Sequence, residues 1–266
     1  MTSPSSSSVD FSKSHKLWLP PDNVHERLLQ YGPPMHTLNS GPMGGGKGAA
    51  NTALLEWIRP YDLAHFKSER VFSVSWTSRG ERPNESNGVE YWFNKLPVDF
   101  LEALESDFLE KVLHPGGYYG TPMPAHGTPT HYEFEVAGYL QSLQNMHPNA
   151  RQFRESNSAV YIAQQCMSQL LSQIMARPDG MSEEKKIHRA ARYPGELKYI
   201  LEHSLPYKVV ENNPGEQDRT NSKVIRAMIG DSDVPLLGRL EISEKIHEAC
   251  DYLHDEGIEP IFIKEA

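Results

Sequence analysis

The sequence alternates short runs of strand character with longer stretches whose apolar residues recur at helical spacing. Strands that alternate with helices are typical of a parallel sheet covered by helices, so we predict an α/β fold. We find no internal repeat. The runs predicted as strands are Met35–Asn39, Arg70–Ser75, Thr130–Glu135, Ala159–Ala163 and Tyr207–Glu211.

Two helices are predicted in the first quarter of the chain. One covers Asp22–Tyr31, with Asp22 as its N-cap. The other begins at Lys47, and we expect Pro60 to end it, because proline removes a backbone donor and clashes with the preceding turn. The apolar stripes are Val24, Leu28 and Leu29 in the first helix and Ala50, Leu54, Trp57 and Ile58 in the second.

The two ends of the chain differ from this central pattern. Residues 1–20 are rich in serine and poor in apolar side chains, which predicts a disordered tail. Residues 231–266 form a predicted extension, with a helix capped by Gly257 and then a strand over Ile258–Lys264. Pro260 lacks a backbone N–H, so we expect this strand at a sheet edge. The helix is indicated by Ile242, Ile246, Ala249, Cys250 and Leu253.

Composition and charge exclude several classes of function. The 266 residues carry 26 Lys and Arg against 35 Asp and Glu, a net charge of −9. Because positive residues form no run, we expect no nucleic-acid or membrane partner. No apolar stretch approaches the roughly 20 residues that span a bilayer, and none is typical of a signal peptide. Two distant cysteines, Cys166 and Cys250, make neither a disulfide framework nor a cysteine zinc site, so we expect a cytoplasmic protein.

A glycine-rich loop lies between the first predicted strand and the helix at Lys47. It has Gly41, four residues, Gly46 and then Lys47, and we call residues 41–47 the phosphate loop. Glycines let backbone N–H groups surround phosphate oxygens, and the lysine and helix N-terminus add positive charge. Gly48 and Ala49 stand where a hydroxyl for magnesium is usual. The alternative interpretation of three consecutive glycines is a plain flexible turn.

The second candidate site is a compact basic and aromatic segment over residues 73–93. Two arginines three positions apart can hold one phosphate from two sides, because each guanidinium offers a planar fork of donors. A carboxylate can accept from the ring N–H and exocyclic amine of guanine. The alternative is a solvated charged loop. The residues that carry the interpretation are Ser75, Arg79, Arg82, Glu85 and Tyr91.

From these motifs onward the sequence resembles the guanylate kinase family over about residues 36–229. The family pattern in the basic segment is matched at Thr77, Arg79, Arg82, Glu85, Gly88, Tyr91 and Phe93. Further matches follow in order, at Phe108-Leu109-Glu110, Tyr118–Thr121, Glu133–Gly138, Arg177, Ser182–Glu184, Arg189 and Asn212.

The resemblance implies a P-loop fold with three layers, α/β/α, around a parallel five-stranded sheet. Within a kinase-like domain at 21–230, it implies a nucleoside-monophosphate-binding subdomain at about 72–125 and a mobile lid at about 176–192. The implied activity transfers the γ-phosphoryl group of ATP to GMP, with Mg²⁺ as cofactor. Small nucleotides are then the partners, and the protein is a monomer or homodimer.

The resemblance also implies a role for each matched residue. The implied catalytic residues are Lys47, Arg79, Arg177 and Arg189. Those implied to bind ATP are Gly41, Gly44, Gly45, Gly46, Lys47, Gly48 and Asn212. Those implied to bind GMP are Ser75, Arg79, Arg82, Glu85, Tyr91, Glu110, Tyr119, Thr121 and Glu135, with Glu133 implied to organise Mg²⁺.

Three departures from the family pattern keep other functions open. The phosphate loop lacks its hydroxyl at Gly48 and Ala49; Glu133 and Glu135 replace aspartates; and Pro194 interrupts the helix that leads from the lid. One alternative is a catalytically silent guanylate-kinase-like binding module. Another is a kinase of a different purine-like monophosphate.

Overall fold

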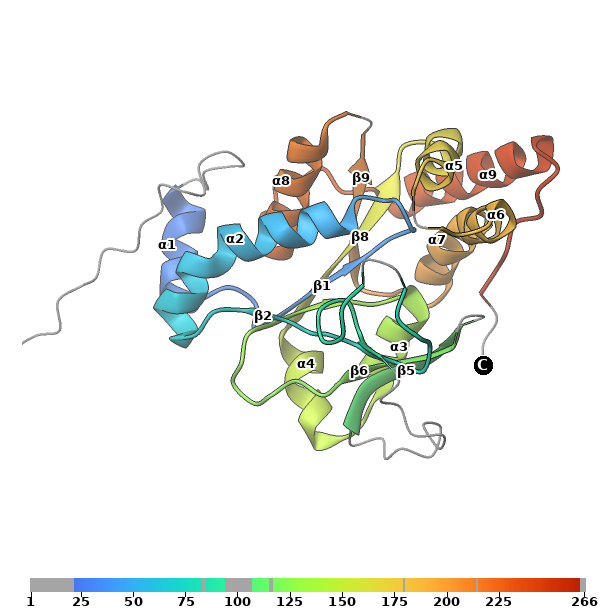
Figure 1. Cartoon of the computed structure of the whole chain (residues 1–266). Helices are drawn as coiled ribbons and strands as arrows, with labels where there is room; N and C mark the ends of the chain where they lie inside the picture. The colour runs from blue at the N-terminus through green and yellow to red at the C-terminus, as the bar shows by residue number, and fades with distance from the viewer. Residues whose placement is uncertain are drawn as a thin grey trace, which may run out of the picture.

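The computed structural model describes residues 22–82, 85–93, 107–114, 117–178, 180–213 and 215–263. The predicted tail at residues 1–20 lies outside them. A five-stranded sheet forms the centre, in the order β2-β7-β1-β8-β9, and every adjacent pair is parallel (Figure 1). The predicted α/β fold with a parallel sheet is therefore confirmed. The strands are β1 (His36–Ser40), β2 (Val71–Phe72), β7 (Thr130–Glu133), β8 (Asn157–Gln164) and β9 (Tyr207–Asn212).

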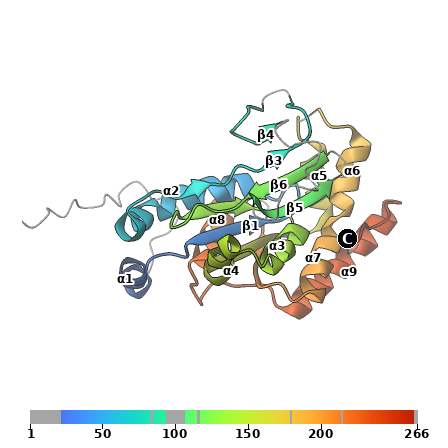
Figure 2. The same cartoon turned by 90° about the horizontal axis from the view of Figure 1, so that it is seen from below.

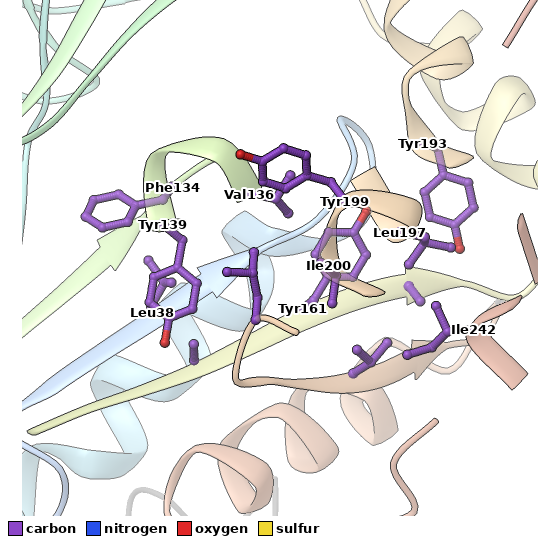
Figure 3. Close-up of a cluster of buried hydrophobic side chains, with 14 of the residues drawn as sticks. Leu38, Phe134, Val136, Tyr139, Tyr161, Tyr193, Leu197, Tyr199, Ile200 and Ile242 are labelled. Atoms are coloured by element: carbon purple, nitrogen blue, oxygen red, sulfur yellow. The ribbon is translucent and has the colours of Figure 1, made fainter. Parts of the chain in front are cut away.

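Helices cover both faces of this sheet. Buried residues of β8 alternate between the faces: Val160 and Ile162 join one core cluster, and Ala159 and Tyr161 join the other. Figure 3 shows part of the latter cluster, with Tyr161 among its labelled side chains. This alternation follows from the two-residue period of a strand. One face carries α1 (Asp22–Tyr31), α2 (Lys47–Phe66) and α8 (Gln217–Met228). The other carries α3 (Val136–Gln144), α4 (Arg151–Ser156), α5 (Met167–Met175), α6 (Glu183–Ala191), α7 (Tyr193–Glu202) and α9 (Arg239–Asp255).

A second, four-stranded sheet follows β2 in the chain and packs against α3 (Figure 2). Its order is β4-β3-β6-β5, with antiparallel pairs except for β3 and β4. It lies inside the segment 72–125 that the family resemblance assigns to a monophosphate-binding subdomain. The strands are β3 (Trp76–Thr77), β4 (Trp92–Phe93), β5 (Phe108–His114) and β6 (Gly117–Pro122). No helix in the described part of the chain is long and apolar enough to cross a membrane.

The expected end of α2 at Pro60 is wrong, because the helix continues to Phe66. The next turn is held by buried contacts: Tyr61 packs on Trp57, and the Asp62 carboxylate binds Arg70 at 2.9 Å. Interior proline costs a helix about 3 kcal/mol, and these contacts outweigh that cost.

The extension after residue 230 is helical as predicted, but its strand is not. Over 258–263 the described chain has no strand, so the predicted strand Ile258–Lys264 is wrong, and its last residue lies outside the described ranges. The segment packs across the start of α7: the Ile261 N–H donates to Ala191 O at 2.9 Å. It thereby satisfies a carbonyl at the end of α6. Pro194 occupies the first turn of α7, where proline is tolerated, so α6 and α7 are separate helices.

Gly195→Ala should destabilise the protein, although alanine favours a helix more than glycine does. A Cβ at Gly195 would lie 2.2 Å from Ile261 O, so α7 and the 258–263 segment cannot both keep their places. We expect a loss of about 1–3 kcal/mol in the free energy of unfolding, typical of overpacking. Chemical denaturation measures it. Gly80→Ala is the control, because nothing lies within 4 Å of its added Cβ. Equal stability of the two variants would contradict the packing described.

His36→Phe should make stability less sensitive to acid. His36 is fully buried, and neither ring nitrogen has a hydrogen-bond partner among the described residues. Burial, followed by the charge of Arg70, lowers the pKa of His36 to about 4. The unfolded chain therefore takes up the proton first, and stability falls by up to about 1.4 kcal/mol per pH unit between pH 6.5 and 4.

Denaturant unfolding at several pH values tests this expectation. The difference between wild type and His36→Phe should be constant above pH 7 and should change progressively below pH 6.5, in favour of the variant. Parallel curves for the two proteins down to pH 4 would show that His36 titrates normally.

Candidate functional site

The phosphate loop connects the end of β1 to the first turn of α2. Gly41, Gly44 and Gly46 have positive φ angles of 151°, 79° and 89°. Glycine adopts such angles without steric cost. A Cβ on Gly41 would also lie 2.8 Å from the carbonyl oxygen of Ile162 in β8. The loop therefore needs glycine for its turn and for its close approach to the sheet.

Lys47, the first residue of α2, folds back over this loop. Its Nζ donates to Gly41 O at 2.8 Å and Pro42 O at 3.0 Å, and lies 3.7 Å from Glu133 Oε1. The N-cap residue, Gly46, gives the first-turn N–H groups no side-chain acceptor. Those groups and the helix dipole favour an anion. Lysine and helix N-terminus together make a site suited to phosphate.

Two side-chain amides at the ends of β8 and β9 hydrogen-bond to the backbone of the phosphate loop. Gln164 Nε2 and Asn212 Nδ2 donate to Gly45 O at 3.3 Å and 3.2 Å. The Thr220 hydroxyl donates to Asn212 Oδ1 at 2.9 Å, which fixes the orientation of that amide. Both amide side chains are buried. Asn212, predicted on the ATP side, thus contacts the backbone of the loop itself.

Arg79 is held in one orientation by its neighbours in the second sheet. Its guanidinium donates to both oxygens of Glu85, at 2.6 Å and 2.8 Å, and to the Tyr119 hydroxyl at 3.1 Å. It also lies 5.0 Å from the ring centroid of Tyr91. Glu85 accepts from the Arg82 backbone N–H at 2.9 Å as well. Hydrogen bonding from Arg79 holds the pKa of Glu85 below its usual range, so this carboxylate stays ionised.

Three other predicted residues form a hydrogen-bonded row on the same sheet. The Thr121 hydroxyl donates to Glu110 Oε1 at 2.6 Å. Because its only hydrogen is used there, the 2.9 Å contact with Ser75 has the Ser75 hydroxyl as donor. Glu110 is buried, and its Oε2 would lie 2.9 Å from a Cβ on Gly138. Glycine at the start of α3 therefore makes room for this carboxylate.

Two carboxylates, one at the last residue of β7 and one just after it, lie at the edge of the sheet next to the phosphate loop. Glu133 Oε2 accepts from Asn51 Nδ2 at 2.9 Å. Glu135 is the N-cap of α3, and its Oε2 lies 2.9 Å from Arg192 Nη2. Within the described ranges, no group of three or more His, Cys, Asp or Glu side chains could hold a metal ion. A metal here would thus need ligands from its substrate and from water.

The predicted lid reaches the phosphate loop through α6. Arg189 Nη1 contacts the Met43 sulfur at 3.2 Å. Desolvation, followed by repulsion from Arg82, lowers the pKa of Arg189, although part of its side chain stays exposed. Arg82 belongs to the second sheet's segment, so positive charges from two segments of the chain lie close enough to repel each other. Arg177 is exposed in the turn after α5, where its carbonyl oxygen accepts from Lys186 Nζ at 2.5 Å.

Several residues that shape this site were not among the predicted ones. Asn51, Gln164 and Arg192 contact predicted residues directly. One signal existed for Asn51: it lies four positions after Lys47 and therefore on the same face of α2. Gln164 and Arg192 carry no local motif, because their roles depend on which strands and helices become neighbours.

Several guanylate kinases are similar to this chain in sequence. The guanylate kinase of Desulfitobacterium hafniense (strain Y51) is 31% identical over 182 residues, which cover 65% of this chain and 80% of that protein. The guanylate kinase of Deinococcus radiodurans is 30% identical over 183 residues, 65% of this chain and 67% of that protein. No protein-family model matches the chain.

Among solved structures, the crystal structure of guanylate kinase from Anaplasma phagocytophilum aligns with a TM-score of 0.48 at 19% sequence identity. The alignment covers 80% of this chain and 94% of that chain.

Proposed function

The chain belongs to the guanylate kinase family, and on that premise we propose that it transfers the γ-phosphoryl group of ATP to GMP, giving ADP and GDP, with Mg²⁺. Its relatives identify it as a phosphotransferase. GMP as the acceptor and Mg²⁺ as the cofactor are what we propose. The observation that carries it is the contact of Arg189, on α6, with Met43 of the phosphate loop, close enough to Arg82 of another segment for the two charges to repel. An arginine at the phosphate loop, with a second arginine from another segment nearby, suits a donor and an acceptor phosphate held face to face.

The donor side would use Lys47 and the backbone of residues 41–48. Phosphoryl transfer requires positioning and charge neutralisation more than covalent chemistry from the protein. Lys47 Nζ already lies over the loop, bonded to two carbonyl oxygens that phosphate oxygens would replace. Arg189 would stabilise the charge on the transferring group, and Arg177 would join it on lid closure. Asn212 would act through the loop backbone, since its amide bonds Gly45 O.

The acceptor phosphate would be bound by Arg79, Arg82, Tyr91 and Tyr119. The Arg79 guanidinium is already fixed by two bonds to Glu85 and one to Tyr119. Preorganised donors lose less freedom on binding than mobile ones. Glu85 would therefore act mainly by orienting the two arginines.

The guanine would be read by Glu110, with Thr121 and Ser75 beside it. Glu110 Oε1 accepts from Thr121, and a carboxylate can also accept from the ring N–H and exocyclic amine that guanine presents side by side. Adenine presents a ring nitrogen lone pair at that edge and would be repelled. Glu135, paired with Arg192, would complete the base side.

Magnesium would neutralise charge on the phosphate oxygens. The described side chains fit an ion held mainly by phosphate and water, because Mg²⁺ dehydrates reluctantly and needs few protein ligands. Glu133, whose Oε1 faces Lys47 at 3.7 Å, is the carboxylate that would orient it.

Turnover of a panel of monophosphates tests the activity. We expect ADP release with GMP and dGMP to exceed that with AMP, UMP and CMP in a coupled assay. Lys47→Met should reduce GMP turnover at least 100-fold while GMP binding persists, because the lysine serves the donor phosphates (a loss of about 3 kcal/mol for a charged hydrogen bond gives about this factor).

Two outcomes would overturn parts of the proposal. GMP binding without turnover of any nucleotide would favour the alternative of a silent binding module, which the missing hydroxyl at Gly48 motivates. Preferred turnover of another purine monophosphate would reassign the acceptor.

Glu110→Gln should weaken the binding of GMP more than the binding of AMP, and the reverse order would contradict the assigned base site.

Gly48→Ser should accelerate the reaction. It restores a hydroxyl next to Lys47, and nothing lies within 4 Å of the added Cβ. A hydrogen bond to a charged group is worth about 1.5–3 kcal/mol, so kcat should rise by up to about 10- to 150-fold. Gly48→Ala is the matched control, since it fills the same space without a hydroxyl. Equal rates for the two variants would show that the hydroxyl is not needed here.

A further inference from the structure

A chain of buried hydrogen bonds runs under α2 from one end of the helix to the other. It begins at the ion pair of Asp62 with Arg70, whose side chains are 0% and 1% exposed. From there Arg70 Nη1 lies 3.3 Å from Thr37 Oγ1, and Thr37 Oγ1 lies 2.9 Å from His131 Nδ1. His131 Nε2 lies 2.9 Å from Asn51 Oδ1, and this residue reaches the site.

The bond from Asn51 to Glu133, at the end of the chain, fixes the direction of all the other hydrogen bonds. Glu133 can only accept when ionised, so Asn51 turns its NH₂ group toward Glu133 and its carbonyl toward His131. His131 must therefore carry its hydrogen on Nε2 and accept at Nδ1 from the Thr37 hydroxyl. The Thr37 oxygen in turn accepts from Arg70. Every donor points toward Glu133, and hydrogen bonds aligned this way strengthen one another.

Both ends of this chain are anchored. Arg70 donates to both Asp62 oxygens, at 2.9 Å and 3.0 Å, and to the carbonyl oxygen of Pro34 at 2.7 Å. Near the other end, Asn39 Nδ2 donates to Asn51 Oδ1 at 2.9 Å, so that oxygen has two donors. The Asn51 amide is thus held from the side of β1 as well as from β7 and cannot rotate without breaking several bonds.

The consequence appears at Glu133, whose two oxygens have different surroundings. Asn51 holds Oε2, whereas Oε1 lies 3.7 Å from Lys47 Nζ. The Glu133 side chain is 37% exposed and would otherwise choose among several rotamers. With one oxygen fixed, the other is presented to the lysine and to the region just before the helix N-terminus.

We propose that Asn51 is a positioning residue, held by His131 and Asn39, that aims Glu133 at the lysine and at the metal–nucleotide complex. The proposal rests on the proposed phosphoryl transfer, because that function supplies the nucleotide. It assigns a task to a polar residue in a helix interior where an apolar one would fill the same space. It also gives a route by which the loop can orient the ion without a hydroxyl at Gly48.

Nucleotide binding with and without magnesium tests the proposal independently of turnover. ATP affinity is measured by calorimetry in Mg²⁺ and in EDTA, and the ratio of the two is the Mg²⁺-dependent gain. Asn51→Leu keeps the branched shape of the side chain and removes the amide. We expect its gain to fall about 10-fold or more, while ATP affinity in EDTA and GMP affinity change less than about threefold. In a Glu133→Gln background, Asn51→Leu should change the gain no further.

Thr37→Val is the matched control for a structural role. It cuts the chain two residues away from Asn51 and leaves the Asn51–Glu133 bond in place. We expect Thr37→Val to lower the melting temperature about as much as Asn51→Leu does, but to keep the wild-type Mg²⁺-dependent gain in ATP affinity. Asn51→Asp, which sets a carboxylate against that of Glu133, should lose the gain as Asn51→Leu does.

An unchanged gain in Asn51→Leu, or equal losses in Asn51→Leu and Thr37→Val, would overturn the proposal, since the amide would then only stabilise the fold. A wild-type protein whose ATP affinity ignores Mg²⁺ would overturn it as well. Intact Mg²⁺-dependent ATP binding without GMP phosphorylation would overturn the proposed function alone.

Discussion

The parallel register of the central sheet is the constraint on which the site depends. Parallel strands end at a common edge, so residues distant in sequence meet there. Asn39 pairs with Glu133, and Gln164 pairs with Asn212, in the backbone register of neighbouring strands. The phosphate loop leaves β1 at this same edge. A slip of one residue between β1 and β7 would turn Glu133 to the other face and separate it from Lys47.

Although the protein is acidic overall, its charges are arranged locally in a way that suits anions. Its net charge of −9 opposes a broad positive surface, yet Arg189 contacts the phosphate loop at Met43 and is close enough to Arg82 for their charges to repel. Glu85 holds Arg79 in a bidentate pair, so this cation is fixed without any ligand. Acidic residues can thus serve to orient arginines, and the excess of negative charge is compatible with a nucleotide site.

The features that could be predicted from sequence are those with a local physical signal. Strand-like runs, the glycines of the phosphate loop and the helix over Arg239–Asp255 belong to this class. Prediction failed where distant contacts decide the outcome. Pro60 stays helical because Asp62 finds Arg70, and residues 258–263 form no strand because they pack on α7 instead. The grouping of Ser75, Thr121 and Glu110 was implied by family resemblance, whereas the contacts of Asn51 with Glu133 and of Arg192 with Glu135 emerged only from the folded chain.

The interior of α2 explains how an altered phosphate loop can still be ordered. A hydroxyl beside the lysine would tie the loop to a metal ion directly, and at Gly48 that group is missing. In its place the helix carries Asn51 one turn later, joined through His131 to a fully buried ion pair. Burying such polar groups is costly unless each finds a partner, and these do. The same bonds that make the burial tolerable also restrict Glu133, so the polar interior of the fold and the geometry of the site are one arrangement.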